Sequence, residues 1–237
     1  MTQSICVFGD SVSKGVVFDS TLKKYMIIKD SFVHLLERAA NMMISNYSKF
    51  GCTVTKGSDI LNKHLNEVSR SDFTVLEFGG NDCDFDWTKV SEAPDAHHVP
   101  KTPVEDFELQ YAKLIENVKN CGGRPVLLSL PPIDAKRYFA WISRGLNQAN
   151  ILKFLGDVEY IYRWHEMYNL AVCRLALQQQ VPLIDISSAF LQAGNYQKYI
   201  CEDGIHPNEQ GHKLIEETIS RYTAHPEKLM LRTQFAS

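Results

Sequence analysis

The sequence predicts an α/β protein in which helices cover both faces of a parallel sheet. Three observations support this: short apolar runs recur along the chain, stretches with helical periodicity separate them, and 237 residues suit one domain of this class. Strands that alternate with helices form parallel sheets. Because crossovers between parallel strands are right-handed, the helices pack on both faces and give a three-layer α/β/α sandwich.

Five apolar runs have the length of buried parallel strands. They cover residues 5–8, 42–45, 73–78, 125–130 and 181–186. Helical periodicity, with apolar side chains on one face, is found at residues 31–40, 104–120, 158–179 and 207–222. Two stretches lack this regularity, and we expect a long loop at about 83–102 and an aromatic-rich insertion at about 131–155. We expect residues 1–237 to form a single domain.

Composition excludes several classes of protein. Lys and Arg number 25 and Asp and Glu 28, so the net charge is −3, whereas a nucleic-acid-binding protein usually has a basic face. The sequence has no apolar run long enough for a membrane span. The six cysteines form no Cys-x-x-Cys pair, and the N-terminus lacks the pattern of a signal peptide. We therefore expect a cytoplasmic protein with reduced thiols and no nucleic-acid partner.

Polar and small residues follow the expected strands, whose carboxyl ends meet at one edge of a parallel sheet, where ligands bind. In chain order these segments are Gly9-Asp10-Ser11, residues 46–53, Gly79-Gly80-Asn81-Asp82, Pro131-Pro132 and, beyond the last strand, Asp203-Gly204-Ile205-His206-Pro207. We therefore expect Ser11, Asn81 and His206 to converge at this edge.

These residue types suit acyl transfer. A serine hydroxyl such as that of Ser11 becomes a good nucleophile when a base takes its proton, and His206 can be that base. Asp203 can hold the other ring nitrogen of His206 and stabilise the imidazolium ion. The tetrahedral intermediate carries an oxyanion, for which the backbone N–H groups of Ser11 and Gly51 and the side-chain amide of Asn81 are the expected donors.

Four blocks of the sequence resemble those of the SGNH, or GDSL-type, hydrolase family. In order across residues 9–208 they are Gly9-Asp10-Ser11, Asn46-x-Ser48-x-x-Gly51-x-Thr53, Gly80-Asn81-Asp82 and Asp203-x-x-His206-Pro207. The resemblance implies a flavodoxin-like five-stranded sheet of order 2-1-3-4-5 and Ser-His-Asp ester hydrolysis without a metal or cofactor. It assigns the nucleophile to Ser11, the oxyanion hole to Gly51 and Asn81, and the base and its orienting group to His206 and Asp203.

The expected activity is that of a serine esterase or acylhydrolase that cleaves a small-molecule ester through an acyl-enzyme. The first expectation for the substrate is a short-acyl, acetyl-type carbohydrate ester, and the alternative is a longer acyl chain on a lysophospholipid or thioester. Trp87, Phe139 and Trp141 are candidate walls of the substrate pocket, although such aromatic residues are more often part of a core. A non-catalytic binding module on the same fold would lack the nucleophile or the base, and this chain has both.

Simpler interpretations compete for some residues. Ser11 alone could cap a helix, and it also begins a Ser-x-x-Lys sequence like that of penicillin-binding enzymes, whose other motifs are absent from this sequence. His97 and His98 are adjacent and therefore point apart, and no third ligand has suitable spacing, so we expect no metal site.

Four further polar residues are expected to have structural roles. Asp10 and Asp82 each follow a strand, where carboxylates commonly accept hydrogen bonds from loop backbone N–H groups. Ser13 is expected at a helix start or in solvent. His212 is expected to face solvent from the last helix.

Overall fold

The computed structural model describes residues 2–40 and 42–224 and contains the expected parallel sheet. The strands lie in the order β4-β1-β5-β6-β7, and each neighbouring pair is parallel. Their bounds are β1 (Gln3–Gly9), β4 (Met42–Asn46), β5 (Phe73–Glu77), β6 (Pro125–Leu128) and β7 (Leu183–Ile184). Counted along the chain, these five strands have the order 2-1-3-4-5, so the predicted sheet is confirmed.

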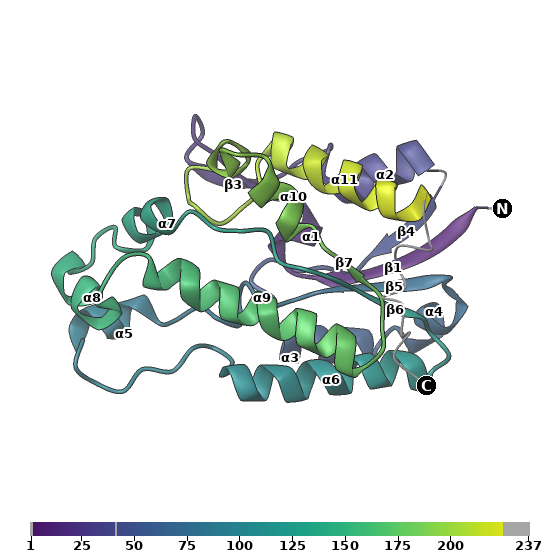
Figure 1. Ribbon diagram of the computed structural model, residues 1–237, viewed down its shortest axis with the longest axis horizontal. Helices are drawn as coiled ribbons and strands as arrows, with labels where there is room; N and C mark the ends of the chain where they lie inside the picture. The colour runs from purple at the N-terminus through teal and green to yellow at the C-terminus, as the bar shows by residue number, and fades with distance from the viewer. Residues whose placement is uncertain (1, 41, 225–237) are drawn as a thin grey trace, which may run out of the picture.

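Helices cover both faces of the sheet, which confirms the three-layer sandwich (Figure 1). One face carries α2 (Phe32–Ala40) and α11 (Glu209–Ala224). The other face carries α3 (Val54–Leu61), α6 (Val104–Asn120) and α9 (Tyr160–Gln178). Shorter elements connect these layers: α1 (Ser11–Lys14), α4 (Leu65–Arg70), α10 (Ser187–Gln192) and the 3-10 helix η1 (Tyr196–Tyr199).

Each face of the sheet has its own apolar core. Helix α6 buries a stripe of residues spaced three or four apart: Phe107, Tyr111, Leu114, Ile115 and Val118. On the opposite face, Phe32 and Leu36 of α2 pack in one cluster with Ile215 and Ile219 of α11. Burying one such side chain stabilises the fold by about 1.5–3 kcal/mol. The two cores fix the positions of the strands, and therefore also the positions of the turns at their carboxyl ends.

An antiparallel hairpin beside the sheet was not expected from the sequence. It consists of β2 (Val16–Asp19) and β3 (Lys24–Ile27) and follows α1 directly. The chain leaves α1 at Gly15, whose φ of 81° favours glycine. Both strands are four residues long and β3 is exposed along its length, so neither shows the alternating pattern by which a half-buried strand is recognised.

Two segments expected to be irregular are partly helical. Residues 83–102 contain α5 (Trp87–Glu92), and residues 131–155 contain α7 (Ala135–Ile142) and α8 (Gln148–Leu155). Each helix begins after a polar residue whose side chain accepts a backbone N–H of the first turn, namely Asp86, Asp134 and Asn147. Such capping residues are a signal in the sequence for the start of each of these helices.

Helices α5, α7 and α8 and the first turns of α9 form a lobe at one end of the molecule, which we call the helical extension (Figure 1). It has an apolar cluster of its own, consisting of Phe85, Val90, Ile133, Ala135, Ile151, Leu155 and Ile161. A polar group joins its segments, because Tyr138 of α7 donates a hydrogen bond to Asp84 at 2.7 Å. The extension is therefore packed around its own core, beyond the two cores of the sheet.

Two polar residues are more buried than the sequence suggested. His212 of α11 is fully buried, accepts the backbone N–H of Phe32 at 3.4 Å and stacks on the ring of Phe32. Burial lowers the pKa of His212 to about 3, so its ring is neutral. Ser13 lies in α1, at the expected helix start, but it is fully buried and does not face solvent.

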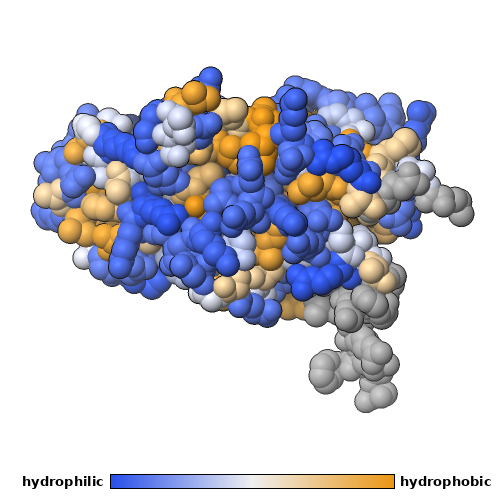
Figure 2. Space-filling model, turned by 90° about the horizontal axis from the view of Figure 1, so that it is seen from above, coloured by the Kyte–Doolittle hydropathy of each residue, from blue (hydrophilic) through white to orange (hydrophobic). Residues whose placement is uncertain are grey.

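The surface is largely polar. Figure 2 shows hydrophilic side chains over most of one face, with hydrophobic side chains in separate patches. Within the described part of the chain, no helix has the length and hydropathy needed to cross a membrane. All six cysteines carry free thiols.

Candidate active site

The turn after β1 places Ser11 at the carboxyl edge of the sheet. Ser11 is the first residue of α1, and the preceding Asp10 caps this helix, accepting the backbone N–H of Val12 at 2.8 Å. A short helix directly after a strand is the kind of tight turn that presents a serine at the top of a sheet. The Ser11 residue is 7 % exposed and borders a cavity.

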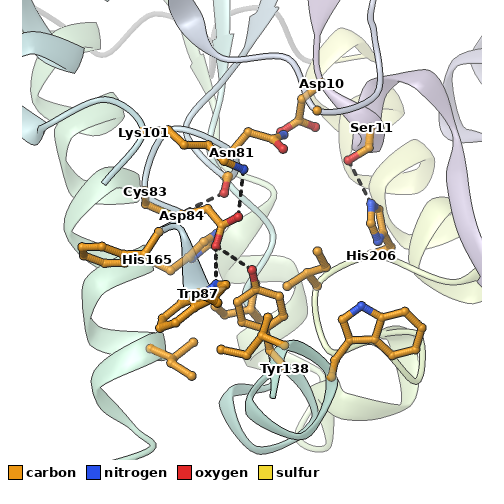
Figure 3. A pocket seen from close by; sticks show the side chains of 18 of the residues that line it. Asp10, Ser11, Asn81, Cys83, Asp84, Trp87, Lys101, Tyr138, His165 and His206 are labelled. Carbon is orange, nitrogen blue, oxygen red and sulfur yellow. Dashed lines mark hydrogen bonds and ion pairs between the residues drawn. The ribbon is translucent and has the colours of Figure 1, made fainter. Parts of the chain in front are cut away.

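A chain of hydrogen bonds joins Ser11, His206 and Asp203 (Figure 3 shows its first link). The Oγ of Ser11 lies 2.9 Å from Nε2 of His206, and Nδ1 of His206 lies 2.5 Å from Oδ2 of Asp203. The other oxygen of Asp203 accepts the backbone N–H groups of Ile205 and His206 at 3.1 and 3.2 Å. The structure thus brings Ser11 to a histidine that lies 195 positions later in the sequence.

Asp203 is ionised in this arrangement. Its burial alone would raise the pKa, but the hydrogen bonds and the charge of His206, together with the backbone N–H bonds, lower the pKa of Asp203 below its usual value. An ionised Asp203 holds a proton on Nδ1 of His206. The Nε2 atom is then free to accept the proton of Ser11.

The turn that carries Asp203 and His206 is fitted against the helical extension. Gly204 has a φ of 83°, and a Cβ at this position would lie 2.4 Å from the backbone nitrogen of Tyr138 and 2.7 Å from the carbonyl oxygen of Asp134. The carbonyl oxygen of Gly204 accepts the backbone N–H of Asp134 at 2.8 Å. The turn of residues 203–206 therefore packs directly on the start of α7.

The three expected oxyanion donors border the same cavity. The side-chain nitrogen of Asn81 donates to Asp10 at 2.8 Å, and an amide has a second hydrogen to donate. The backbone N–H groups of Ser11 and Gly51 have no hydrogen-bond acceptor among residues 2–40 and 42–224. Gly51 has a φ of 68°, and a Cβ there would meet nothing within 4 Å, so its backbone conformation is the reason for a glycine.

Glu77 is a buried acid beneath the Ser11 turn that sequence reasoning missed. It ends β5, is 1 % exposed, and its Oε2 accepts hydrogen bonds from the hydroxyl of Ser13 at 2.9 Å and from the backbone N–H groups of Ser13 and Asp10, each at 3.3 Å. Burial, and then the negative charge of Asp10, raise the pKa of Glu77 well above its usual value. The only sequence signal was an acidic residue within an apolar strand.

Asp82 has the structural role expected of it. Its carboxylate accepts the backbone N–H of Val54, at the start of α3, with distances of 3.0 and 3.2 Å to its two oxygens. It also accepts the hydroxyl of Thr102 at 2.7 Å. Burial raises the pKa of Asp82 to about 6. Asp82 thus joins α3 to the segment that leads into α6.

A cavity of about 770 Å³ opens beside Ser11; the helical extension and the segments that lead into it provide most of its walls, and the hairpin contributes Tyr25. Trp87 and Trp141, two of the candidate wall residues, border it. Phe139 is not among its lining residues and packs instead against the apolar cluster of the extension. On α7, residues 138, 141 and 142 share the face toward the cavity, and Phe139 lies about 100° around the helix from Tyr138.

Two aromatic side chains flank His206 on the outer side. The ring centroid of Tyr25, from the unexpected strand β3, lies 5.2 Å from that of His206. The ring of Phe50 stacks on the imidazole with a centroid distance of 6.0 Å and an interplanar angle of 12°. Tyr25 also contacts Trp141. An aromatic wall therefore adjoins the imidazole ring of His206.

The described residues contain no group of three or more His, Cys, Asp or Glu side chains placed to hold a metal ion. Within the His97-His98 pair, Nε2 of His98 hydrogen-bonds the carbonyl oxygen of Ala93 at 2.8 Å. The ring of His98 also packs edge-on against Phe154. His98 therefore has a structural role in the extension.

The fold and site define a class: α/β proteins with a serine, a histidine and an aspartate linked at the carboxyl edge of a parallel sheet. The family model of the GDSL-like Lipase/Acylhydrolase family matches residues 7–214, and the chain belongs to this family of ester-hydrolysing serine enzymes.

Individual relatives agree with this membership. The Arabidopsis thaliana protein GDSL esterase/lipase At5g45920 is 25% identical over 232 residues, with 93% of this chain and 86% of the relative covered. GDSL esterase/lipase CPRD49 from the same organism is 23% identical over 190 residues, covering 78% of this chain and 66% of its own length. The crystal structure of a lipase/acylhydrolase from Enterococcus faecalis has a TM-score of 0.64 at 19% identity, covering 93% and 94% of the two chains, and shares the fold.

Proposed function

We propose that the protein hydrolyses a carboxylic ester through an acyl-enzyme formed on Ser11. The observation that carries this proposal is the buried hydrogen-bonded chain from Ser11 through His206 to Asp203, which ends at a cavity large enough for a substrate. A serine, a neutral imidazole and an ionised carboxylate in this order form the arrangement that makes a serine hydroxyl nucleophilic.

The reaction follows from the geometry. Nε2 of His206 takes the proton of Ser11 as Oγ attacks the ester carbonyl, and Asp203 stabilises the resulting imidazolium ion. The N–H groups of Ser11 and Gly51 and the amide of Asn81 stabilise the oxyanion. His206 then gives its proton to the leaving alcohol. A water molecule attacks the acyl-enzyme with His206 again as the base, and the acid is released.

The cavity favours a longer acyl chain over an acetyl group. An acetyl group would fill only a small part of about 770 Å³. Ligand pockets of this size, lined by apolar and aromatic side chains, typically enclose larger ligands. We therefore propose an ester with a medium or long apolar acyl group, and the acetyl carbohydrate ester remains the alternative substrate.

A series of p-nitrophenyl esters from acetate to dodecanoate tests this function, with Ser11→Ala assayed in parallel. We expect the wild-type protein to release nitrophenol with an optimum above butanoate. The variant should lose at least about 1,000-fold in kcat, because it lacks the nucleophile. A chelator in the assay should leave the wild-type rate unchanged, since side chains perform every proton transfer in this mechanism.

Two results would contradict the proposal. Equal, measurable activity of the wild type and the Ser11→Ala variant would exclude Ser11 as the nucleophile, and no activity of either protein on any ester would favour a binding module. An optimum at acetate would keep the serine mechanism but return the substrate to the short-acyl class.

A further inference from the structure

The proposed mechanism divides the cavity into two limbs. His206 protonates the leaving alcohol, so the alcohol lies beside the His206 ring, where Tyr25 and Phe50 are. The acyl group extends from the carbonyl carbon to the other side, past Asn81. Figure 3 shows that this side of the cavity leads away from His206 toward Asp84, Trp87 and His165. We call this part the acyl limb.

His165 is a polar side chain without a partner in the acyl limb. It belongs to α9, borders the cavity and is 4 % exposed. Neither ring nitrogen has a hydrogen bond to any of the described residues. Nδ1 is fully buried, whereas Nε2 keeps some accessible surface and is the atom that a ligand in the cavity can reach. Burial lowers the pKa of His165 to about 4, so the ring is neutral near pH 7 and has one donor and one acceptor. A largely buried polar atom without a partner is unfavourable, so a ligand that pairs with Nε2 gains affinity.

The carboxylate of Asp84 in the acyl limb is already engaged. Asp84 accepts hydrogen bonds from Trp87 Nε1 at 2.8 Å and from the hydroxyl of Tyr138 at 2.7 Å, and it forms an ion pair with Lys101 at 2.9 Å. These three partners hold the carboxylate in place. Lys101 offsets the charge of Asp84, so a charged tail of either sign would lose its hydration in a largely apolar cavity without a free counter-charge.

A neutral hydroxyl group on the substrate can pair with His165 and brings no charge into the cavity. It can donate to one kind of imidazole nitrogen and accept from the other, and it carries no charge to bury. Apolar side chains, Leu155 and Ile161 among them, line much of the acyl limb and suit a hydrocarbon chain. We propose that the acyl limb binds a hydroxyacyl group, a hydrocarbon chain whose distal hydroxyl group hydrogen-bonds to His165. This inference rests on the proposed ester hydrolysis and specifies its substrate class.

The test compares ethyl esters of straight-chain acids, from butanoate to dodecanoate, with the matching ω-hydroxy esters. Acid release is followed in a pH-stat, and the ratio of kcat/KM for the hydroxy ester over the plain ester is determined at each length. We expect this ratio to peak at one chain length, where the hydroxyl group reaches His165. His165→Leu should lower the peak ratio about 3–10-fold, as expected for the loss of one hydrogen bond.

Two further variants serve as controls. His165→Gln keeps a donor and an acceptor and should retain part of the peak. Ile161→Leu alters an apolar wall on the same helix, so it should change the rates on both esters together and leave their ratio intact. If His165→Leu does not fold, the comparison of wild type with His165→Gln and the chain-length peak in the wild type still decide the question.

The outcomes separate this inference from the proposed function. A ratio that is flat over all chain lengths, or a peak that His165→Leu leaves unchanged, overturns the hydroxyacyl site while ester hydrolysis stands. If no ester is hydrolysed at all, the proposed function fails, and calorimetry of the Ser11→Ala protein with the free acids then tests the site directly. Binding of an ω-hydroxy acid no tighter than that of the plain acid overturns it.

Discussion

The catalytic edge of the sheet and the helical extension meet at one cavity, yet they are built in different ways. The edge consists of turns that directly follow strands, such as Gly9-Asp10-Ser11 after β1 and the Asn81 turn after β5. The extension consists of short helices around a small apolar cluster of its own. The edge positions polar atoms to within hydrogen-bond distance, whereas the extension encloses a volume.

This difference separates chemistry from specificity. Ser11, His206 and Asp203 interact through distances that leave little tolerance, so substitutions there should affect every ester equally. Trp87 and Trp141 act as walls, through their shape and apolar surface. The effect of substituting them on kcat/KM should therefore differ from one ester to another. The predictions below test this division, beginning with the largest expected effect.

Asp203→Asn should lower kcat about 10⁴-fold on all esters, because an amide favours the wrong tautomer of His206 while keeping a similar shape. The measurement is kcat and KM across the ester series, together with the melting temperature. Asp95→Asn, an equivalent change at an exposed surface carboxylate, is the matched control. A loss that varies strongly with acyl length would contradict the division between edge and extension.

Gly204→Ala should disturb both regions, and Gly51→Ala only one. At Gly204 the new Cβ would meet the backbone of α7 and the residue has a positive φ, so we expect the free energy of unfolding to fall by about 2–5 kcal/mol. At Gly51 only the positive φ is unfavourable, and we expect about 1–2 kcal/mol.

Chemical denaturation of both glycine variants measures this difference. Equal losses of stability in the two variants would show that the catalytic turn does not depend on its contact with the extension. In that case the two regions would be more independent than their shared hydrogen bond between Asp134 and Gly204 indicates.

Glu77→Gln should change the dependence of stability on pH. The pKa of Glu77 is raised in the folded protein, so above its ordinary value of 4.5 the folded state binds more protons than the unfolded state. The wild type therefore loses stability as the pH rises through the folded pKa, by up to about 1.4 kcal/mol per pH unit for one proton. Glutamine resembles the protonated acid and does not titrate, so the free energy of unfolding of the variant should fall less as the pH rises.

The free energy of unfolding of the wild type and Glu77→Gln, measured from pH 5 to pH 9, tests this expectation. Because Asp10 and Glu77 interact, the substitution also alters the titration of Asp10, so the difference between the two curves reports the Glu77–Asp10 pair. Parallel curves would mean that Glu77 does not hold the proton of the Glu77–Asp10 pair.

The sequence by itself predicted the parallel sheet, and its resemblance to the SGNH hydrolase family predicted the order of the strands. The strands could be recognised because each is a compact apolar run, and the family because its polar blocks follow strands or lie in short motifs. The long helix α6 was predicted with its observed bounds, since its apolar stripe repeats over several turns. The observed sheet and the matching family model confirm the fold and the family, whereas the roles of Ser11, Asp203 and His206 stay predictions.

Only the tertiary structure revealed the hairpin, the helices of the extension and the buried acid under the nucleophile. Strand β3 is exposed, so its residues carry no burial pattern, yet Tyr25 reaches His206. Glu77 and His165 are polar groups that derive their properties from what surrounds them in space. Burial, proximity and the shape of a cavity arise from contacts between distant segments, and no local pattern of residues encodes them.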